Sequence, residues 1–430
     1  MSDTAPISAA AASIAPEPPT RRALLATYVA GLFSMGYIDV FVFLMPLYGG
    51  SLGMSATEIG TLVGARSLLP VFLSIHVGTL MDRFGTRRVT AVFVAVAICC
   101  APLFPLLPSF PALLALQVIN GGVVSFGWAG AQTLIAQIGH GDADYLGRFS
   151  FVSRIGTTAA PIIVGAIWDR GGLWPAYLFG TLWGMALMVA LMRAPEPGPT
   201  HEEPHDAASG PAPAPARFRP RDLLPRLSDY VASFALMAVP AIALSAAVIF
   251  VRNATSGIQN SLYVVYLEDI GHSATVIGIL FAAVEIASGL GSLLAGRAMR
   301  MGRPHSTMVT GTVIAIALIA ITPLIAQLGA PVLIVVALLL GAQLWRGTLQ
   351  GVIQPVMFAV QSRAVGRHQQ GSIVGLRQTV TRVAAIAVPP LMGAIADLWT
   401  LELSFYILGA LMLLLCAPLA LLARRVERGG

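Results

Sequence analysis

The chain contains no lysine, only three cysteines and few charged side chains of either sign. Charged residues make up 11% of the 430 residues, whereas hydrophobic residues make up 56%. Because a Walker A motif requires a lysine, the polypeptide is not expected to hydrolyse ATP. The three cysteines lie in apolar runs and indicate no disulfide framework. A soluble core of this length cannot bury so large an apolar fraction, so many side chains must contact lipid.

Apolar runs long enough to cross a bilayer recur along nearly the whole chain. A helix needs about 20 residues to cross about 30 Å of hydrocarbon. Twelve spans are predicted, near residues 25–48, 57–80, 89–108, 111–137, 148–168, 174–193, 243–266, 274–296, 306–327, 331–356, 373–396 and 402–423. The sequence therefore predicts an all-α polytopic membrane protein made of two six-helix bundles.

Polar segments set the predicted domain boundaries. Residues 1–22 form an Ala/Pro/Ser-rich tail without the apolar core of a signal peptide. An N-terminal bundle (23–193), a Pro-rich linker (194–228), a C-terminal bundle (229–423) and a short tail (424–430) follow. The linker residues 201–205 match the H-E-x-x-H zinc pattern, but Pro204 opposes the helix that this pattern needs. We expect no metal and no cofactor.

The arginines are distributed unevenly between the two predicted sides of the membrane. With the N-terminus inside, 19 of the 26 fall in cytoplasmic segments, six within spans and only Arg170 outside. This asymmetry predicts that both termini are cytoplasmic. We expect a multi-pass protein of the plasma membrane, that is, of the bacterial inner membrane. The net charge of +6 thus reflects topology, and we expect the lipid bilayer rather than nucleic acid as a partner.

The two predicted bundles are related in sequence. Residues 55–60 (SATEIG) recur as residues 273–278 (SATVIG), at an offset of 218. A second set recurs at an offset of 228: Arg154, Pro161, Gly165 and Asp169 match Arg382, Pro389, Gly393 and Asp397. Six helices per repeat insert both copies in the same orientation, as in transporters whose halves rock about a site at the midplane.

Charged residues are missing from the interior of every third span. The mid-span charges fall on the remaining helices: Asp39, Arg66, Arg154, Arg252, Glu285, Arg346, Arg377 and Arg382. A charge at a helix centre costs about 2.5–3.5 kcal/mol on insertion scales, so each needs a partner, water or a function. We infer that every third helix faces lipid and that the others surround a polar cavity.

The loop between the second and third spans carries a family signature. It reads Gly78-Thr79-Leu80-Met81-Asp82-Arg83-Phe84-Gly85-Thr86-Arg87-Arg88. Apart from Thr86, this loop resembles the G-x-x-x-D-R-x-G-R-R signature of the major facilitator superfamily. The resemblance implies the fold of this superfamily. It also implies that the chain is a secondary active transporter rather than an enzyme, and that this loop takes part in gating. Its gating residues are Gly78, Asp82, Arg83, Gly85 and Arg87, with Asp82 pairing across the halves in one conformation.

Two further motifs qualify this resemblance. The second copy of the loop has Met299 where the acid belongs, so only the first loop is expected to act as a charged latch. Gly156, Pro161 and Gly165 partly resemble the exporter-associated pattern G-x-x-x-G-P-x-x-G-G. Because the Pro and the final Gly recur in the eleventh span, we attribute them to helix bending and close packing rather than to a direction of transport.

Three central arginines indicate the class of substrate. Arg66, Arg252 and Arg346 lie near the middle of their spans, and the six mid-span arginines outnumber the two mid-span acids. A guanidinium binds a carboxylate or phosphate in bidentate fashion, so a small organic anion is the expected substrate. The alternative is a purely structural role, in which backbone carbonyls and the two acids satisfy these arginines. The other predicted substrate-binding residues are Tyr37, Asn120, Asn260, Tyr263 and Gln350.

Asp39 and Glu285 are the predicted proton-coupling residues. Glu285 lies one position from the repeat counterpart of Arg66, so the two are expected to share a depth and to pair across the cavity. An anion that takes the arginine would leave Glu285 free to capture a proton. Two alternatives remain open: a proton-driven efflux antiporter for drugs or metabolites, and a membrane sensor or scaffold that does not transport.

Overall fold

The computed structural model describes residues 19–140, 142–196, 236–301, 303–364 and 370–429. The predicted tail up to residue 18 and the linker from residue 197, with its H-E-x-x-H pattern, lie outside the described residues. Within the described ranges, all regular elements are helices.

The N-terminal half forms six spans. Its helices are α1 (Arg21–Ser51), α2 (Ala56–Ala65), α3 (Leu68–Phe84), α4 (Thr86–Cys100), α5 (Leu103–Leu106), α6 (Phe110–Ile138), α7 (Ala143–Gly171) and α8 (Leu173–Arg193). The second span is divided into α2 and α3 by a break at Arg66 and Ser67. This break places Arg66 in the middle of the span.

The C-terminal half repeats this arrangement. Its elements are η2 (Leu236–Ala238), α10 (Pro240–Gln259), α11 (Leu262–Asp269), α12 (Ala274–Ser292), α13 (Ala295–Arg300), α14 (Pro304–Ala320), α15 (Thr322–Ala326), α16 (Val332–Ala364), α17 (Gln370–Leu398) and α18 (Leu401–Gly429). Among the described residues, 11 helices are long and apolar enough to span a bilayer, and the shorter apolar α14 supplies the twelfth span. The predicted fold class is confirmed.

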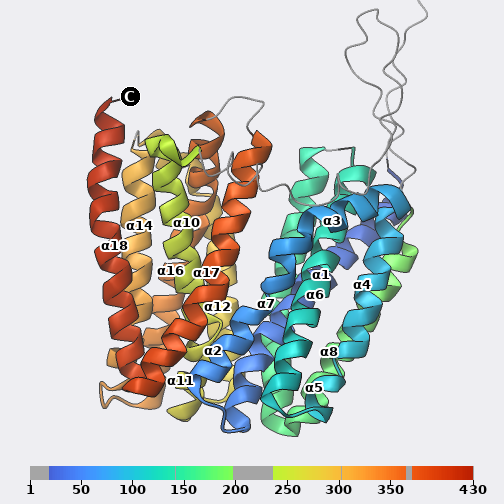
Figure 1. Cartoon of the computed structure of the whole chain (residues 1–430), viewed down its shortest axis with the longest axis horizontal. Helices are drawn as coiled ribbons and strands as arrows, with labels where there is room; N and C mark the ends of the chain where they lie inside the picture. Colours follow the sequence, from blue (N-terminus) through green and yellow to red (C-terminus); the bar gives the residue numbers. More distant parts are fainter. Residues whose placement is uncertain (1–18, 141, 197–235, 302, 365–369, 430) are drawn as a thin grey trace, which may run out of the picture.

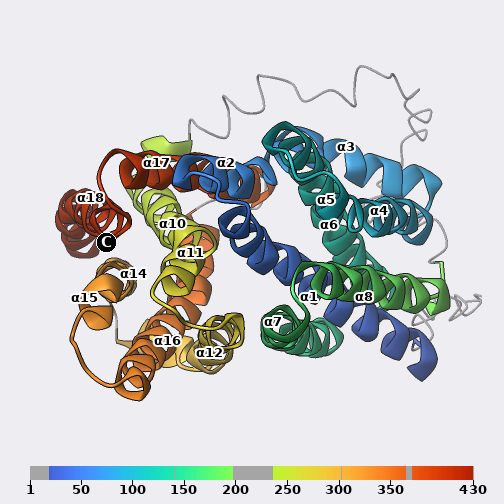
Figure 2. The same cartoon turned by 90° about the horizontal axis from the view of Figure 1, so that it is seen from below.

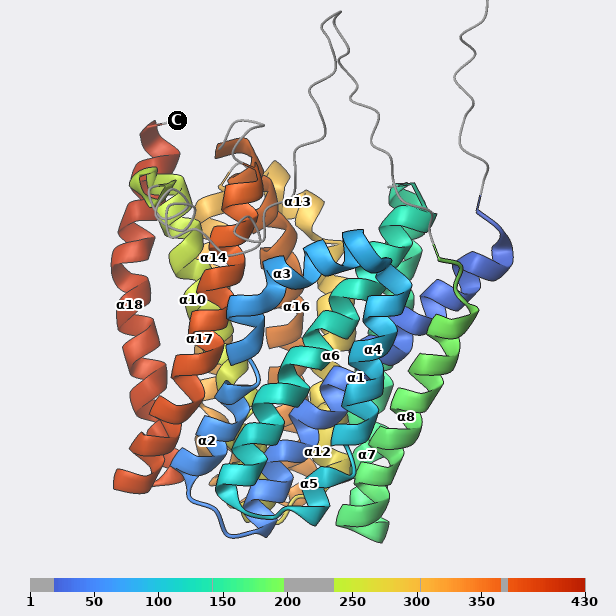
Figure 3. The ribbon, with the colours of Figure 1, turned by 45° about the vertical axis from the view of Figure 1, so that its right-hand side comes forward.

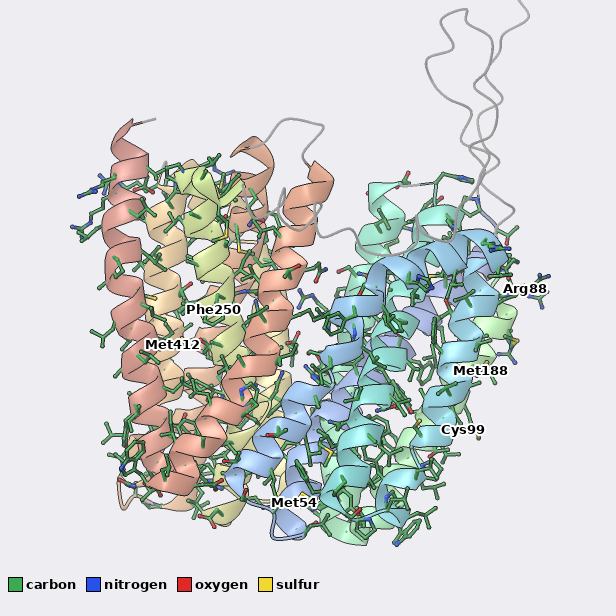
Figure 4. All side chains as sticks on the ribbon, in the orientation of Figure 1. Met54, Arg88, Cys99, Met188, Phe250 and Met412 are labelled. Carbon is green, nitrogen blue, oxygen red and sulfur yellow. The ribbon has the colours of Figure 1, made fainter. Side chains whose placement is uncertain are left out.

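The two halves converge at one end of the molecule and diverge toward the other (Figure 1), and Figure 3 shows the same helices turned by 45° about the vertical axis. We call the converging end, marked by Met54 in Figure 4, the closed face. The opposite end, marked by Arg88, carries the ends of the described chain and is called the termini face. At the closed face, α2 lies beside α17 and α7 lies beside α12 (Figure 2).

Buried apolar side chains follow the same division. The largest cluster contains residues of both halves, and the rings of Phe43 and Phe281 meet across the boundary with centroids 5.5 Å apart. The clusters nearer the termini face are each confined to one half. The hydrophobic effect therefore joins the halves mainly at the closed face.

Every third span lies at the edge of the molecule. Figure 2 shows α4 and α8 at one edge and α14 and α18 at the other. These spans expose large apolar side chains, among them Val92, Leu182, Leu324 and Leu414. Their placement agrees with the inference drawn from the missing charges.

Each half caps a helix of the other half at the closed face. Asp169, near the end of α7, accepts hydrogen bonds from the first two backbone N–H groups of α12, both at 2.8 Å. Asp397, near the end of α17, accepts from the first two N–H groups of α2, both at 2.9 Å. The carboxylates satisfy orphan donors and face the positive ends of the helix dipoles. We call these two contacts the reciprocal caps.

Glycines allow the backbones to approach closely beside the reciprocal caps. A Cβ at Gly60 would lie 2.2 Å from the carbonyl oxygen of Pro389, and a Cβ at Gly278 would lie 2.4 Å from that of Pro161. Larger side chains would therefore separate the halves. The repeated residues of the two halves are largely those that meet each other at the closed face.

The reciprocal caps yield a prediction about conformation. The double variant Asp169→Ala/Asp397→Ala removes both acceptors and should shift the population toward states that are open at the closed face. Each cap contributes about 1 kcal/mol, so loss of both should change the ratio of states about 30-fold. Distances between spin labels at Ser51 and Trp399 measure this shift.

The matched control is Glu58→Ala, because Glu58 accepts a hydrogen bond from the Ser55 N–H within its own half at 2.9 Å. This variant should leave the label distances unchanged. Label distances in the double aspartate variant that equal those of the wild type would show that the caps do not hold the closed face.

Candidate functional site

A salt bridge joins the two halves near the middle of the bundle. Arg154 Nη1 of α7 lies 3.4 Å from Glu285 Oε2 of α12, and their side chains are 38% and 37% exposed. Both residues lie well inside their spans, so solvent reaches the space between the halves at this depth. The partner of Glu285 is thus Arg154, and the predicted pairing of Glu285 with Arg66 is not the one that the structure forms.

Asp39 and Arg66 lie on the N-terminal side of this space. Asp39 of α1 is within electrostatic range of Glu285 and Arg66 and lies near Thr157 of α7. Among the described residues, neither Asp39 Oδ2 nor Thr157 Oγ1 has a hydrogen-bond partner, although both atoms are buried. The N-terminal half therefore presents an unsatisfied carboxylate oxygen.

Gly121 of α6 fixes the position of the Arg66 backbone. A Cβ at Gly121 would lie 2.3 Å from the Arg66 carbonyl oxygen, so only glycine permits this contact. Arg66 also lies within electrostatic range of Arg382 of α17. The neighbouring Asn120 is buried, and its Oδ1 has no hydrogen-bond partner among the described residues.

Arg346 is the most deeply buried charge on the C-terminal side. The residue is 1% exposed, and its Nε donates a hydrogen bond to Gln343 Oε1 at 3.0 Å. Within the described part of the chain, both terminal nitrogens, Nη1 and Nη2, are buried without a partner. The buried hydroxyl of Tyr263 and the Nε2 atom of Gln350 are likewise unpartnered. A buried donor without a partner is costly, and four such groups on α11 and α16 require an explanation.

Arg252 adds a second guanidinium on this side. Its Nη1 donates a hydrogen bond to Gln354 Oε1 at 3.4 Å, while its buried Nε has no partner in the described residues. Glu285 lies within electrostatic range of Arg154, Arg346 and Arg252. One carboxylate thus faces three guanidiniums, and the space between the halves keeps an excess of positive charge.

Two further predicted substrate-binding residues lie on α1 and at the end of α10. Tyr37 points into the packing of its own half, where its hydroxyl donates to the Ala97 carbonyl oxygen at 2.8 Å. Asn260 ends α10, and its backbone N–H donates to the Ser256 carbonyl oxygen at 2.9 Å. Tyr37 is satisfied structurally and does not join the arginine cluster. Asn260 lies at the helix break, and its substrate role stays a prediction.

The predicted gating loop lies at the termini face, between α3 and α4. Gly85 adopts a φ of 93°, which favours glycine, and so permits the tight turn. Arg87 forms a salt bridge with Glu196 at 3.2 Å and donates a hydrogen bond to the Ala194 carbonyl oxygen at 2.9 Å, both within its own half. Arg83 lies over the ring of Phe84 at 5.1 Å. Gly78 is within α3, and the Asp82 side chain lies outside the described part of the structure.

The sequence did not identify Thr157 as a residue of the site, and it did not predict a partner for Arg154. Both lie on α7 with the i, i+3 spacing that places two side chains on one face of a helix. That spacing was the available signal for Thr157. The partner of Arg154 depends on which helix lies opposite, and the sequence does not report this.

Comparison with known proteins gives consistent results. A family model described as Major Facilitator Superfamily matches residues 27–252 and 245–430. The quinolone resistance protein NorA of Staphylococcus aureus is 25% identical over 162 residues, which are 37% of this chain and 42% of NorA. The uncharacterized MFS-type transporter y4rN of Sinorhizobium fredii is 32% identical over 123 residues, 29% of this chain and 27% of that protein. These matches span less than half of each relative.

Solved structures share the fold over almost the entire chain. A mutant of the nucleoside transporter NupG aligns with a TM-score of 0.77 at 14% identity, over 93% of this chain and 99% of that chain. A bacterial homolog to the human lysosomal transporter Spinster, inward-facing and unoccupied, aligns with a TM-score of 0.72 at 15% identity, over 95% and 97%. At such identities, the likeness concerns the fold alone.

The unpartnered guanidinium of Arg346 predicts an unusual effect on stability. Arg346→Met should leave the thermal unfolding midpoint in detergent unchanged or raise it, because an apolar side chain of similar length removes a buried charge that is largely unsatisfied. Arg87→Met removes a satisfied guanidinium and should cost about 1 kcal/mol. A larger loss of stability for Arg346→Met than for Arg87→Met would contradict a binding role and favour a structural one.

Proposed function

Because the chain belongs to the major facilitator superfamily, we propose that it is a secondary active transporter of a small organic anion, coupled to protons by alternating access. The superfamily assignment covers both halves of the chain and supports transport itself. The substrate class and the coupling rest on the arrangement of charges between the halves.

The buried guanidinium of Arg346 carries the proposal for an anion. Its two terminal nitrogens are buried, charged and unpartnered among the described residues. Such donors are stable only if a ligand or water satisfies them, and a carboxylate or phosphate matches the fork of a guanidinium. Among the described residues, Tyr263, Gln350 and Arg252 supply further buried donors without a partner on the same side. In this proposal the C-terminal half holds the anionic group of the substrate.

Glu285 links substrate binding to a proton. In the absence of substrate, this carboxylate is stabilised by Arg154 and by the fields of Arg346 and Arg252. An anion that binds Arg346 cancels part of that field, and the carboxylate is then better accommodated with a proton. Substrate and proton therefore bind together, which is the requirement for coupled transport.

The conformation fits an intermediate of alternating access. With the termini in the cytoplasm, as the distribution of arginines predicts, the closed face is the outer one. The reciprocal caps then seal the outside while the halves diverge toward the cytoplasm. Release of these caps, and closure near the gating loop at Asp82, would expose the same arginines to the outside.

A proton-driven exporter of drugs or metabolites is the second candidate. Its support is the sequence similarity to NorA, whose name denotes quinolone resistance, together with the unsatisfied Asp39 carboxylate, which could receive a cationic group. Thermal-shift screening against carboxylates, phosphorylated metabolites and cationic dyes distinguishes the two candidates. Stabilisation by cationic dyes alone would favour export.

Removal of Arg346 should abolish transport without unfolding the protein. In proteoliposomes, Arg346→Ala should reduce uptake of the anion found by screening about 100-fold, because about 3 kcal/mol of charge-assisted hydrogen bonding is lost. Arg66→Ala should also impair uptake. The matched control is Arg193→Ala, which removes an exposed guanidinium at the end of α8. Uptake by Arg346→Ala at the control rate would contradict the anion site.

Glu285→Gln should separate exchange from accumulation. This variant should still exchange labelled for unlabelled substrate across the membrane, but it should lose accumulation driven by a pH gradient. Asp39→Asn serves as the comparison, because it neutralises the other mid-span acid while leaving the Arg154–Glu285 pair in place. Accumulation at the wild-type level by Glu285→Gln would transfer the proton-carrying role to Asp39.

A further inference from the structure

A pocket lies outside the central site, between α14 and α18 near the termini face. Its volume is about 490 Å³, and it is lined by Arg303, Ser306, Val309, Thr310, Ala420, Arg424 and Glu427. These two helices are the ninth and twelfth spans, which lie side by side at the outer edge of the molecule (Figures 1 and 2). The pocket therefore adjoins lipid rather than the space between the halves.

The lining residues form two facing helical stripes that change from polar to apolar with depth. Ser306, Val309 and Thr310 share one face of α14, and Ala420, Arg424 and Glu427 recur along α18 at i, i+4 and i+7. From Glu427 down to Ala420 the depth is about 10 Å at 1.5 Å per residue. Charged groups thus stand at the rim, while small and apolar side chains stand at the base.

The rim keeps a surplus of positive charge because its carboxylate is already engaged. Glu427 accepts hydrogen bonds from the Ser306 backbone N–H at 2.8 Å and from the Ser306 hydroxyl at 2.5 Å. This caps the start of α14. Within the described ranges, no carboxylate lies within ion-pair distance of Arg303 or Arg424. Two guanidiniums therefore remain available at the level of the lipid headgroups.

We propose that this pocket, which we call the headgroup pocket, binds the phosphate of an anionic phospholipid from the leaflet at the termini face. Arg303 and Arg424 hold the phosphate, since guanidiniums match its oxygens. The hydroxyl of Thr310 lies one turn deeper, at the level of the glycerol, and Val309 and Ala420 contact the first part of an acyl chain. A soluble anion would leave this apolar base uncovered, so the amphipathic shape favours a lipid.

Native mass spectrometry of the full chain, purified in detergent with added phosphatidylglycerol or phosphatidylcholine, tests the proposal. The wild type should retain one phosphatidylglycerol more tightly than any phosphatidylcholine. Arg303→Gln/Arg424→Gln should weaken retention about 30-fold, because each basic group contributes roughly fivefold. Arg88→Gln/Arg193→Gln removes the same charge from exposed positions on the other half and should retain the lipid.

A second variant distinguishes lipid binding in the headgroup pocket from general attraction of anionic lipid to surface charge. Ala420→Trp fills the base but leaves both arginines, so it should also lose the tightly held lipid. Should this variant fail to fold, the two double-arginine variants decide the question. Equal loss of lipid in both of them would overturn the proposal in favour of general surface charge. Displacement of the bound lipid by millimolar inorganic phosphate would overturn it in favour of a free-anion site.

Discussion

Two aspartates, each bound to the start of a helix in the opposite half, join the two halves at the closed face. Asp169 and Asp397 accept backbone N–H groups that no intrahelical carbonyl can satisfy, and they do so across the boundary between the halves. Gly165 and Gly393, one turn away, let the same helices approach to backbone contact. Because these contacts use small groups and main chain, they can separate and re-form as whole rigid surfaces. The divergence toward the termini face, and with it access to the central charges, depends on this fixed end.

The central charges form a second constraint, since they are only partly neutralised. Arg154 and Glu285 pair across the halves, while Arg346 and Arg252 keep donors without partners in the described part of the chain. A fold selected only for stability would place apolar side chains at these positions, because buried charges are costly. Their presence is more simply explained by a ligand that completes the site. The same reasoning separates Arg346 from Arg87, whose Nε and Nη1 both have partners within its own half.

The fold could be predicted well from the sequence, and the site only in part. Hydropathy gave the twelve spans, because the bilayer imposes both length and composition, and the missing charges identified the peripheral helices. The position of each charge along its span was also predictable. Its partner was not, because a position along the span does not determine which helix stands opposite. Arg66 lies on the span that packs against α17, whereas α7 stands beside α12 and brings Arg154 to Glu285. The prediction that Tyr37 binds substrate was wrong for the same reason. Its position along the span was suitable, but the side of α1 that carries Tyr37 faces its own half.

The absence of lysine has a consequence for energetics. A guanidinium keeps its charge at every accessible pH, so the positive charges between the halves are constant, and in the proposed mechanism the mid-span carboxylates Asp39 and Glu285 are the groups that titrate. In that mechanism, the transported proton is carried by one of these two groups. If one proton accompanies each monovalent anion, as we propose for Glu285, the substrate and the proton together carry no net charge across the bilayer. Transport would be electroneutral, and the concentration ratio would follow the pH difference while remaining insensitive to the membrane potential, which acts only on net charge moved.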